Sequence, residues 1–328
     1  MPFSTLTKIK TAVNNIVSLN RPFYDVALTG GEPTIHPHIF ELISTLHGKL
    51  GERLNSVSIT TNGSRNALLY ENLADIAKYL LIRMNVSIHT DHVEMDHILD
   101  LIEKLSHNVR MNFLIMFNPD KREFVHEIYE TLFEYRKKFQ FSMNIILLRN
   151  GDRVDSRHTQ EDFEWQKKAN AKFAELVRSV APKFPALKPS RHPIRIFHEV
   201  EENGEKRIIP LKNRALNMNN GLLNFTGMYC ISYSHILEIE ESGLCRGMVC
   251  RVDSPLCNIY DENCFKPIRD KLIHGVKCPH HICGCIVNDR IPKFASEEDA
   301  KKYVEFAQKR QAELFAEYDA AHAIKKTI

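Results

Sequence analysis

Cysteine is the residue type whose distribution most clearly indicates chemistry in this chain. No cysteine precedes position 230 in the 328 residues, and all eight then follow within the last third. A disulfide framework would need an oxidising compartment, and residues 1–10 lack the apolar run of a secretory signal. Metal ligation by thiolates is therefore predicted for Cys230, Cys245, Cys250, Cys257, Cys264, Cys278, Cys283 and Cys285.

The residues leave two kinds of metal open. Thiolates suit [4Fe–4S] clusters, and eight of them could hold two clusters, or one cluster with spare cysteines. From the residues alone zinc comes first, because Cys278 is followed by Pro279, His280 and His281, which add imidazoles to the available ligands.

A second candidate site follows a predicted strand near the N-terminus, where residues 28–34 read Leu-Thr-Gly-Gly-Glu-Pro-Thr. Gly30 and Gly31 let a ligand approach the main chain closely. Pro33 favours an extended conformation at Glu32, so that neighbouring carbonyl groups point outward. We expect an edge rich in hydrogen-bond acceptors that suits an ammonium group. The alternative is an ordinary turn between a strand and a helix.

Strands and helices alternate through the first half of the chain and must position these residues. Short loops join them, which predicts a parallel sheet, either open or closed into a barrel. Strands are expected over 24–29, 56–61, 83–88, 109–117 and 141–148, and helices over 5–19, 38–49, 67–80, 95–105 and 123–138. Further on, we expect a helix over 160–180, a hairpin around Asn203-Gly204 and a last helix from Ser296 to about Ile324.

Several of these strands alternate polar and apolar residues, although buried parallel strands usually read as apolar runs. Side chains alternate between faces along a strand, so the polar residues share one face. They predict a ligand cavity, the alternative being that they bond to one another or to water. These residues are Ser58, Thr60 and Asn62 in one strand and Asn85, Ser87 and His89 in the next.

The Gly-Gly-Glu-Pro sequence, Thr61-Asn62-Gly63 and the cysteine segment together resemble the radical S-adenosylmethionine enzymes. The resemblance implies a partial (β/α)6 TIM-like barrel, followed by a cysteine-rich module of the SPASM or twitch type and a terminal helix. It also implies that Gly30, Gly31, Glu32 and Pro33 bind the amino group of the cofactor's methionine. Asn62, Ser87 and His89 would then line the cofactor's side of the barrel.

One element of that family is absent, namely the Cys-x3-Cys-x2-Cys loop that binds its radical-generating [4Fe–4S] cluster. The sequence opens with a helix, and only five of six expected strands are visible, which would leave the strand at 24–29 with a bare edge. We therefore expect a barrel without its first strand, and we interpret Met1 as an internal methionine of a longer protein. The alternative is a degenerate member without radical chemistry.

The resemblance implies S-adenosylmethionine and one or two auxiliary [4Fe–4S] clusters as cofactors, with the radical cluster only in a longer form. The predicted function is hydrogen abstraction from a substrate, with a peptide or protein side chain inferred by analogy and an electron donor as partner. This chain alone would be inactive; the alternative is a non-catalytic iron–sulfur or zinc protein. Expected domains are 1–150 (barrel), 151–226 (helix, proline-rich linker and hairpin), 227–292 (cysteine module) and 293–328 (terminal helix).

Composition narrows the remaining possibilities. The net charge of +3 is too small to indicate a nucleic-acid partner. No apolar run reaches the roughly 18 residues that span a bilayer, so a cytoplasmic protein is expected. The charge runs Lys121-Arg122 and Arg136-Lys137-Lys138, at the two ends of one helix, are interpreted as solvated.

Overall fold

The computed structural model describes two compact units. Residues 23–190 form the first, which we call the sheet unit, and residues 1–22 with 191–328 form the second, which we call the cysteine unit. The described residues are 4–65, 67–150, 153–184, 199–202, 205–208, 226–231, 234, 236–247, 255–268, 272, 275–279 and 293–326.

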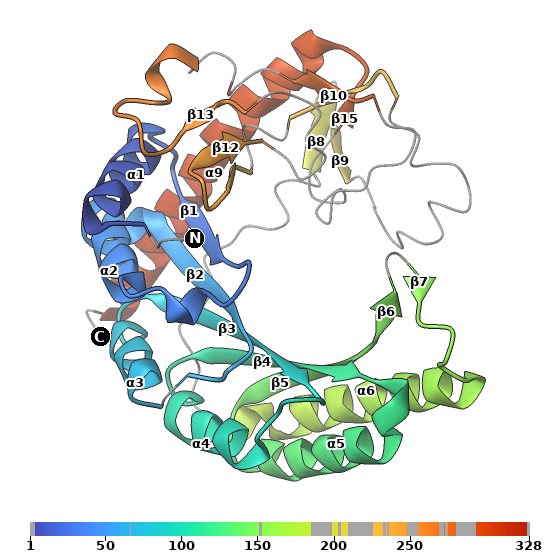
Figure 1. The fold of residues 1–328 in the computed structure, drawn as a ribbon. Helices are drawn as coiled ribbons and strands as arrows, with labels where there is room; N and C mark the ends of the chain where they lie inside the picture. The colour runs from blue at the N-terminus through green and yellow to red at the C-terminus, as the bar shows by residue number, and fades with distance from the viewer. Residues whose placement is uncertain are drawn as a thin grey trace. The chain divides into compact units, whose positions relative to one another are not determined.

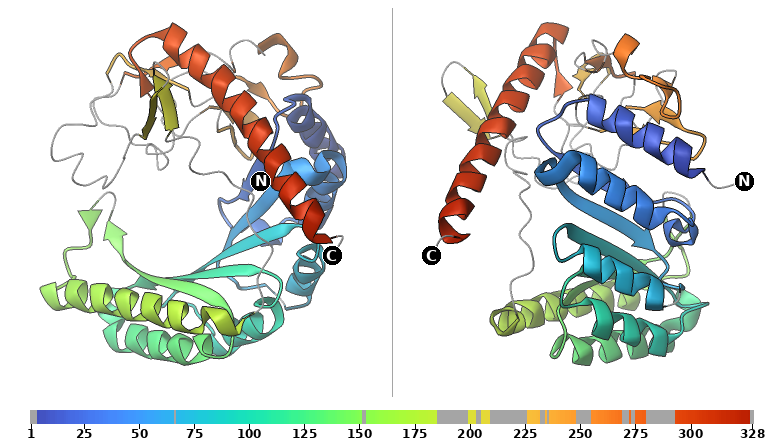
Figure 2. Two further views of the ribbon diagram at one scale, coloured as in Figure 1. Left: turned by 180° about the vertical axis from the view of Figure 1, so that it is seen from behind. Right: turned by 90° about the vertical axis from the view of Figure 1, so that its left-hand side faces the viewer.

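The sheet unit is built on five parallel strands that pair in the order of the sequence. They are β1 (Tyr24–Leu28), β2 (Leu54–Thr61), β3 (Leu81–His89), β4 (Arg110–Phe117) and β5 (Phe141–Leu147). Helices lie along the outer face of this curved sheet (Figures 1 and 2). They are α2 (Ile39–Leu50), α3 (Ala67–Ile76), α4 (Met95–Leu105), α5 (Arg122–Arg136) and α6 (Gln160–Val180). The predicted α/β class with its partial TIM-like alternation is confirmed.

The core of the sheet unit lies between the strands and these helices. In β3, Met84 and Val86 are fully buried, whereas His89 is exposed and the polar residues between them are partly buried. Apolar residues on α4 complete the layer, with Leu101 and Leu105 also fully buried. Each large apolar side chain removed from water contributes about 1.5–3 kcal/mol, so this layer fixes the register of the strands.

The opposite face of the sheet carries a row of hydrogen-bonded polar side chains. The Asn85 amide donates to Ser58 Oγ at 3.2 Å, and the Asn112 amide donates to Asn85 Oδ1 at 3.3 Å. Asn112 Oδ1 in turn accepts hydrogen bonds from Ser142 at 2.9 Å and Asn144 at 3.4 Å. The predicted polar face exists, and in this row the side chains bond mainly to one another.

Two details of this unit differ from expectation. Helix α3 ends at Ile76, and the chain to Leu80 forms turns instead of a further helical turn. Arg136, interpreted from its charge run as solvated, is only 2% exposed. Its guanidinium donates to the Phe139 carbonyl at 3.1 Å and lies over the Phe184 ring at 4.8 Å, and the charge run gives no sign of this cover.

The described residues of the cysteine unit include short antiparallel strands and the helices α1 (Leu6–Ser18) and α9 (Glu297–Lys326). One three-stranded sheet orders β14 (Val276–Lys277), β10 (Tyr229–Cys230) and β15 (Lys293–Phe294), and the other orders β11 (Glu238–Ile239), β12 (Leu244–Arg246) and β13 (Cys257–Asn258). The expected hairpin is present as the antiparallel pair β8 (Glu199–Glu202) and β9 (Glu205–Ile208). The expected terminal helix is α9, where Ser296 Oγ accepts a hydrogen bond from the Asp299 amide at 3.1 Å.

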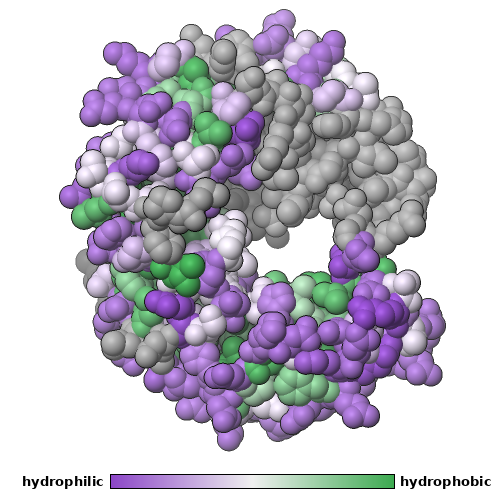
Figure 3. Space-filling view, in the orientation of Figure 1, coloured by the Kyte–Doolittle hydropathy of each residue, from purple (hydrophilic) through white to green (hydrophobic). Residues whose placement is uncertain are grey.

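Hydrophilic side chains cover most of the sheet unit in Figure 3, with scattered apolar patches. In the part of the chain that the structure describes, no helix is both long and apolar enough to cross a lipid bilayer.

Candidate functional site at the carboxyl edge of the sheet

The Gly-Gly-Glu-Pro sequence directly follows β1 at the carboxyl edge of the sheet. Gly30 has φ +90° and Gly31 has φ +50°, a region that favours glycine because a Cβ would strain the backbone. A Cβ built on either residue would meet no atom within 4 Å. The turn is therefore open, and a ligand can reach its main chain.

Glu32 joins the end of β1 to the end of β2 through its carboxylate. Oε1 accepts hydrogen bonds from the Thr34 amide at 3.0 Å, the Thr34 hydroxyl at 2.6 Å and the Thr61 hydroxyl at 2.8 Å. Oε2 accepts from the Asn62 amide at 2.7 Å. The side chain of Glu32 is thus a structural tie between the ends of β1 and β2.

The pKa of Glu32 reflects this position. Burial alone would raise the pKa, because removal from water disfavours a charged carboxylate. Hydrogen bonds from Thr34, Asn62 and Thr61 favour the charged form and outweigh the burial, so the pKa lies below its ordinary value. Glu32 is therefore an anion at neutral pH.

The other residues predicted to contact the cofactor lie at neighbouring strand ends. Asn62 follows β2, and its Oδ1 accepts a hydrogen bond from the Ser64 amide at 3.0 Å. Ser87 and His89 lie near the end of β3 on the polar face, Ser87 partly buried and His89 exposed. In register, Ser87 pairs with Leu114 and His89 with Met116 of β4. Apolar side chains therefore interrupt the polar face toward β4.

Charged contacts also join the loops that follow β3 and β4. Lys121 lies 3.1 Å from the Asp91 carboxylate and donates to the Thr90 carbonyl at 3.2 Å. Asn118 donates to the same carboxylate at 3.4 Å. The hydrogen bond from Lys121 lowers the pKa of Asp91. The Glu32 contacts thus join the ends of β1 and β2, and these contacts join the ends of β3 and β4.

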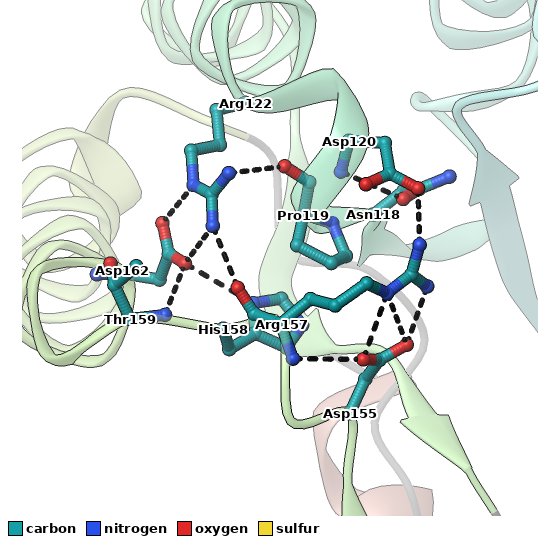
Figure 4. A network of polar contacts seen from close by, with 9 residues as sticks. All are labelled: Asn118, Pro119, Asp120, Arg122, Asp155, Arg157, His158, Thr159 and Asp162. Atoms are coloured by element: carbon teal, nitrogen blue, oxygen red, sulfur yellow. Dashed lines mark hydrogen bonds and ion pairs between the residues drawn. The ribbon is translucent and has the colours of Figure 1, made fainter.

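A denser network joins the loop after β4 to the start of α6 (Figure 4). Arg122 donates to Asp162 from Nε at 2.8 Å and from Nη2 at 2.9 Å, and Asp162 is only 4% exposed. Asp162 also accepts from the Thr159 amide at 2.7 Å, which completes a capping box for α6. The Arg122 hydrogen bond lowers the pKa of Asp162 to about 2. Arg157 pairs with Asp155 and Asp120 in the same network.

Three of the predicted metal ligands lie together in the cysteine unit. Cys245 and Cys257 are direct partners across β12 and β13, and Cys264 follows in the next turn. Burial raises the pKa of the Cys245 and Cys264 thiols, and both thiols also interact with Cys257. Gly243, with φ +89°, leads into this group, and a Cβ there would lie 2.4 Å from both Asn258 and Tyr260.

Cys230 and Cys278 belong to the other three-stranded sheet of this unit, where Cys278 directly follows β14. Cys230 lies on β10 opposite Val276, while the Cys278 amide donates to the Met228 carbonyl at 2.8 Å. Both cysteines are buried. The remaining predicted ligands, Cys250, Cys283 and Cys285, and the alternative ligands His280 and His281 lie outside the described residues. Among the described residues, no three Cys, His, Asp or Glu side chains already form a metal-binding group.

Residues 4–151 match the sequence model of the Radical SAM superfamily. This part of the chain is a radical SAM domain. The match spans the open glycine turn, Glu32 and all five parallel strands, which are the features that the sequence assigned to the cofactor.

Two curated proteins are similar to parts of the chain, and both are named GTP 3',8-cyclase. The protein from Rhizobium leguminosarum bv. trifolii is 40% identical over 65 residues, which cover 20% of this chain and 18% of that protein. The protein from Rhizobium etli is 28% identical over 120 residues, covering 31% of this chain and 34% of that protein. The chain thus spans about a third or less of the curated relatives it matches.

The structure of the radical SAM domain also reveals residues that sequence reasoning missed. The hydroxyls of Thr34 and Thr61 donate hydrogen bonds to Glu32, and Thr34 directly follows the Gly-Gly-Glu-Pro sequence. Asn15 on α1 contacts the cysteine segment, more than 200 residues away. The contact between Thr61 and Glu32 could have been inferred, because Thr61 ends β2 and Glu32 follows the neighbouring strand β1. No local pattern identifies Asn15 as a contact residue.

Proposed function

We propose that the carboxyl edge of the sheet binds S-adenosylmethionine and that the chain serves radical SAM-type chemistry. The observation that carries the proposal is the open turn at Gly30 and Gly31, held in place by the Glu32 tie. Carbonyl groups in this turn are suited to accept hydrogen bonds from the cofactor's ammonium group. Asn62, Ser87 and His89 follow at the adjoining strand ends, where they would contact its nucleoside part.

Radical SAM chemistry requires S-adenosylmethionine and a [4Fe–4S] cluster, and the residues at the carboxyl edge fit only the first of these. S-adenosylmethionine fits the open turn, and when bound it would supply the carbon radical that abstracts hydrogen. The [4Fe–4S] cluster that generates this radical in the family is held by three cysteines, and this sequence has none before Cys230. The carboxyl edge of the sheet therefore does not fit that cluster, and we derive no step through it.

The cysteine unit supports a separate proposal, that its thiols hold auxiliary iron–sulfur clusters. Cys245, Cys257 and Cys264 lie together, with Cys245 and Cys264 buried, and the buried Cys230 and Cys278 lie on and directly after the paired strands β10 and β14. Cysteines in both small sheets are compatible with one or two clusters. Zinc remains the competing metal, and sulfide analysis separates the two, because a zinc site contains none.

The binding proposal has a matched test in two glycines. Gly31 and Gly51 have φ +50° and +54°, and a Cβ on either would meet open space. Alanine should strain the backbone at both positions because φ is positive, but only Gly31 adjoins the proposed site. We expect Gly31→Ala to weaken S-adenosylmethionine binding in equilibrium dialysis about tenfold or more, roughly 1.4 kcal/mol, and Gly51→Ala to leave it unchanged. Equal affinities for both variants and the wild type would contradict the proposal.

Catalysis is tested on the anaerobically reconstituted chain with a strong reductant. Formation of 5′-deoxyadenosine would support a complete radical enzyme. Binding without 5′-deoxyadenosine would support the second candidate, a metal-binding protein derived from this fold.

For the substrate, we propose a nucleoside triphosphate, as the relatives' name indicates for those proteins. Arg83 and Arg110 lie in register near the amino ends of β3 and β4, away from the carboxyl edge, so we do not assign them to this substrate. Binding of GTP to the chain in equilibrium dialysis would support this substrate. Binding of a peptide in place of GTP would contradict it.

A further inference from the structure

Helix α1 begins the chain, yet one of its faces packs against the cysteine segment. Ala12, Ile16 and Leu19 recur at helical spacing and contact the buried cluster that contains Cys245 and Cys264. Asn15 lies on this same face, between Ala12 and Ile16, and is only 3% exposed. A buried amide among apolar neighbours is costly unless both of its N–H groups are bonded.

Asn15 meets that requirement with two main-chain carbonyl groups of a single turn. Its Nδ2 donates to the Ile259 carbonyl and to the Asp261 carbonyl, each at 2.8 Å. The turn itself is closed by the Asp261 amide, which donates to the Asn258 carbonyl at 3.1 Å. Both N–H groups of one side chain thus fix a segment 244 and 246 positions further along the chain.

This turn is the connection between Cys257 and Cys264. Cys257 is held by its pairing with Cys245 across β12 and β13, but Cys264 lies beyond the strands. Its distance from the other two thiols therefore depends on the path of residues 258–263. A ligand set must be held closely to the productive geometry, and hydrogen bonds behind the ligands commonly supply that precision.

We propose that Asn15 is a positioning residue for the three-cysteine group Cys245, Cys257 and Cys264. By holding the Ile259 and Asp261 carbonyls, it sets the place of Cys264 relative to the other two thiols. The inference rests on the proposed metal site and adds a residue of α1 to it. Contacts beside Asn15 keep α1 in place, because the hydroxyls of Ser4 and Tyr260 lie 2.6 Å apart and Lys8 lies over the Tyr260 ring.

The chain offers a matched control in Asn14, an exposed asparagine one position earlier in α1. We compare Asn15→Leu, Asn14→Leu and Cys264→Ser with the wild type after anaerobic reconstitution with iron and sulfide. Iron retained against a chelator and the electron paramagnetic resonance spectrum of the reduced protein are measured for each. Asn15→Leu should lose iron about tenfold faster, since outer hydrogen bonds commonly change metal affinity by about 10–100-fold. Its spectrum should also change, while Asn14→Leu should match the wild type.

The outcomes separate the two claims. If Asn15→Leu keeps the wild-type iron, chelation rate and spectrum while Cys264→Ser loses iron, the role of Asn15 is wrong and the metal site stands. If Cys264→Ser also keeps all of its iron, the metal assignment of this group is wrong. Should Asn15→Leu fail to fold by circular dichroism, Asn15→Asp replaces it. Asn15→Asp has nearly the same shape and lacks both donors, and the same two measurements then decide.

Discussion

At the scale of single residues, Glu32 illustrates how a motif residue can act through the chain instead of on a ligand. Its carboxylate accepts hydrogen bonds from Thr34, Thr61 and Asn62, so the charged form of Glu32 stabilises the shape of the turn. The open space lies beside Gly30 and Gly31. Loss of Glu32 would therefore disturb ligand binding through the loss of that shape.

Glu32→Gln should lower stability, because an amide cannot accept all of these hydrogen bonds. Hydrogen bonds to charged groups are worth about 1.5–3 kcal/mol, and Glu32 is partly buried, so we expect a loss of about 1–3 kcal/mol at pH 7. The folded pKa of Glu32 is lowered, so its contribution is present above the unfolded pKa. That contribution disappears as the pH falls through the folded pKa.

Urea denaturation of the wild type and Glu32→Gln between pH 7 and pH 3 measures this effect. The stability difference between them should shrink toward acid pH. Glu94→Gln is the control, since Glu94 is exposed and makes no capping hydrogen bond at the start of α4. A difference for Glu32→Gln that is small at pH 7, or constant across the pH range, would contradict the tie.

At the scale of elements, α4 and β3 pack so closely against the loop after β2 that position 63 has room only for glycine. Gly63 has φ +73°, and a Cβ there would lie 3.0 Å from Val86 and 3.5 Å from both Ile98 and Leu101. Gly63→Ala should therefore lose about 1–3 kcal/mol from strain and overpacking. Gly48→Ala, in α2 with open space around it, should gain about 0.5–1 kcal/mol. Denaturation midpoints that move in the same direction would contradict this account.

The elements of the sheet unit could be predicted from the sequence because each has a local signal. Alternation along 83–88 identified β3, which the structure extends to Leu81–His89, and the helix expected over 95–105 is α4 with the same bounds. The site was predictable only as a motif. Thr34 contacts Glu32 from two residues away, whereas Thr61 contacts it because the fold brings the ends of β1 and β2 together. Asn15 contacts a turn more than 200 residues away, and Arg136 is covered by Phe184, so no local pattern reveals either arrangement.

At the scale of the whole molecule, the division into units assigns α1 to the cysteine unit, although α2 and the following helices belong to the sheet unit. The side chains of Asn15 and Ser4 both form hydrogen bonds to residues 259–261. Protection of the α1 amides should therefore depend on the cysteine unit. In native-state hydrogen exchange at rising urea, α1 should lose protection together with β12 and β13.

The control in that experiment is α2, whose amides should open together with β3 because both belong to the sheet unit. Asn15→Leu should lower the urea concentration at which α1 and β13 open, since it removes two hydrogen bonds that hold the turn after β13 to α1, and should leave α2 and β3 unchanged. If α1 opened with α2 in the wild type, or if Asn15→Leu weakened all four elements equally, the cysteine unit would not be a cooperative unit that includes α1. The N-terminal helix would then have to be assigned to the sheet.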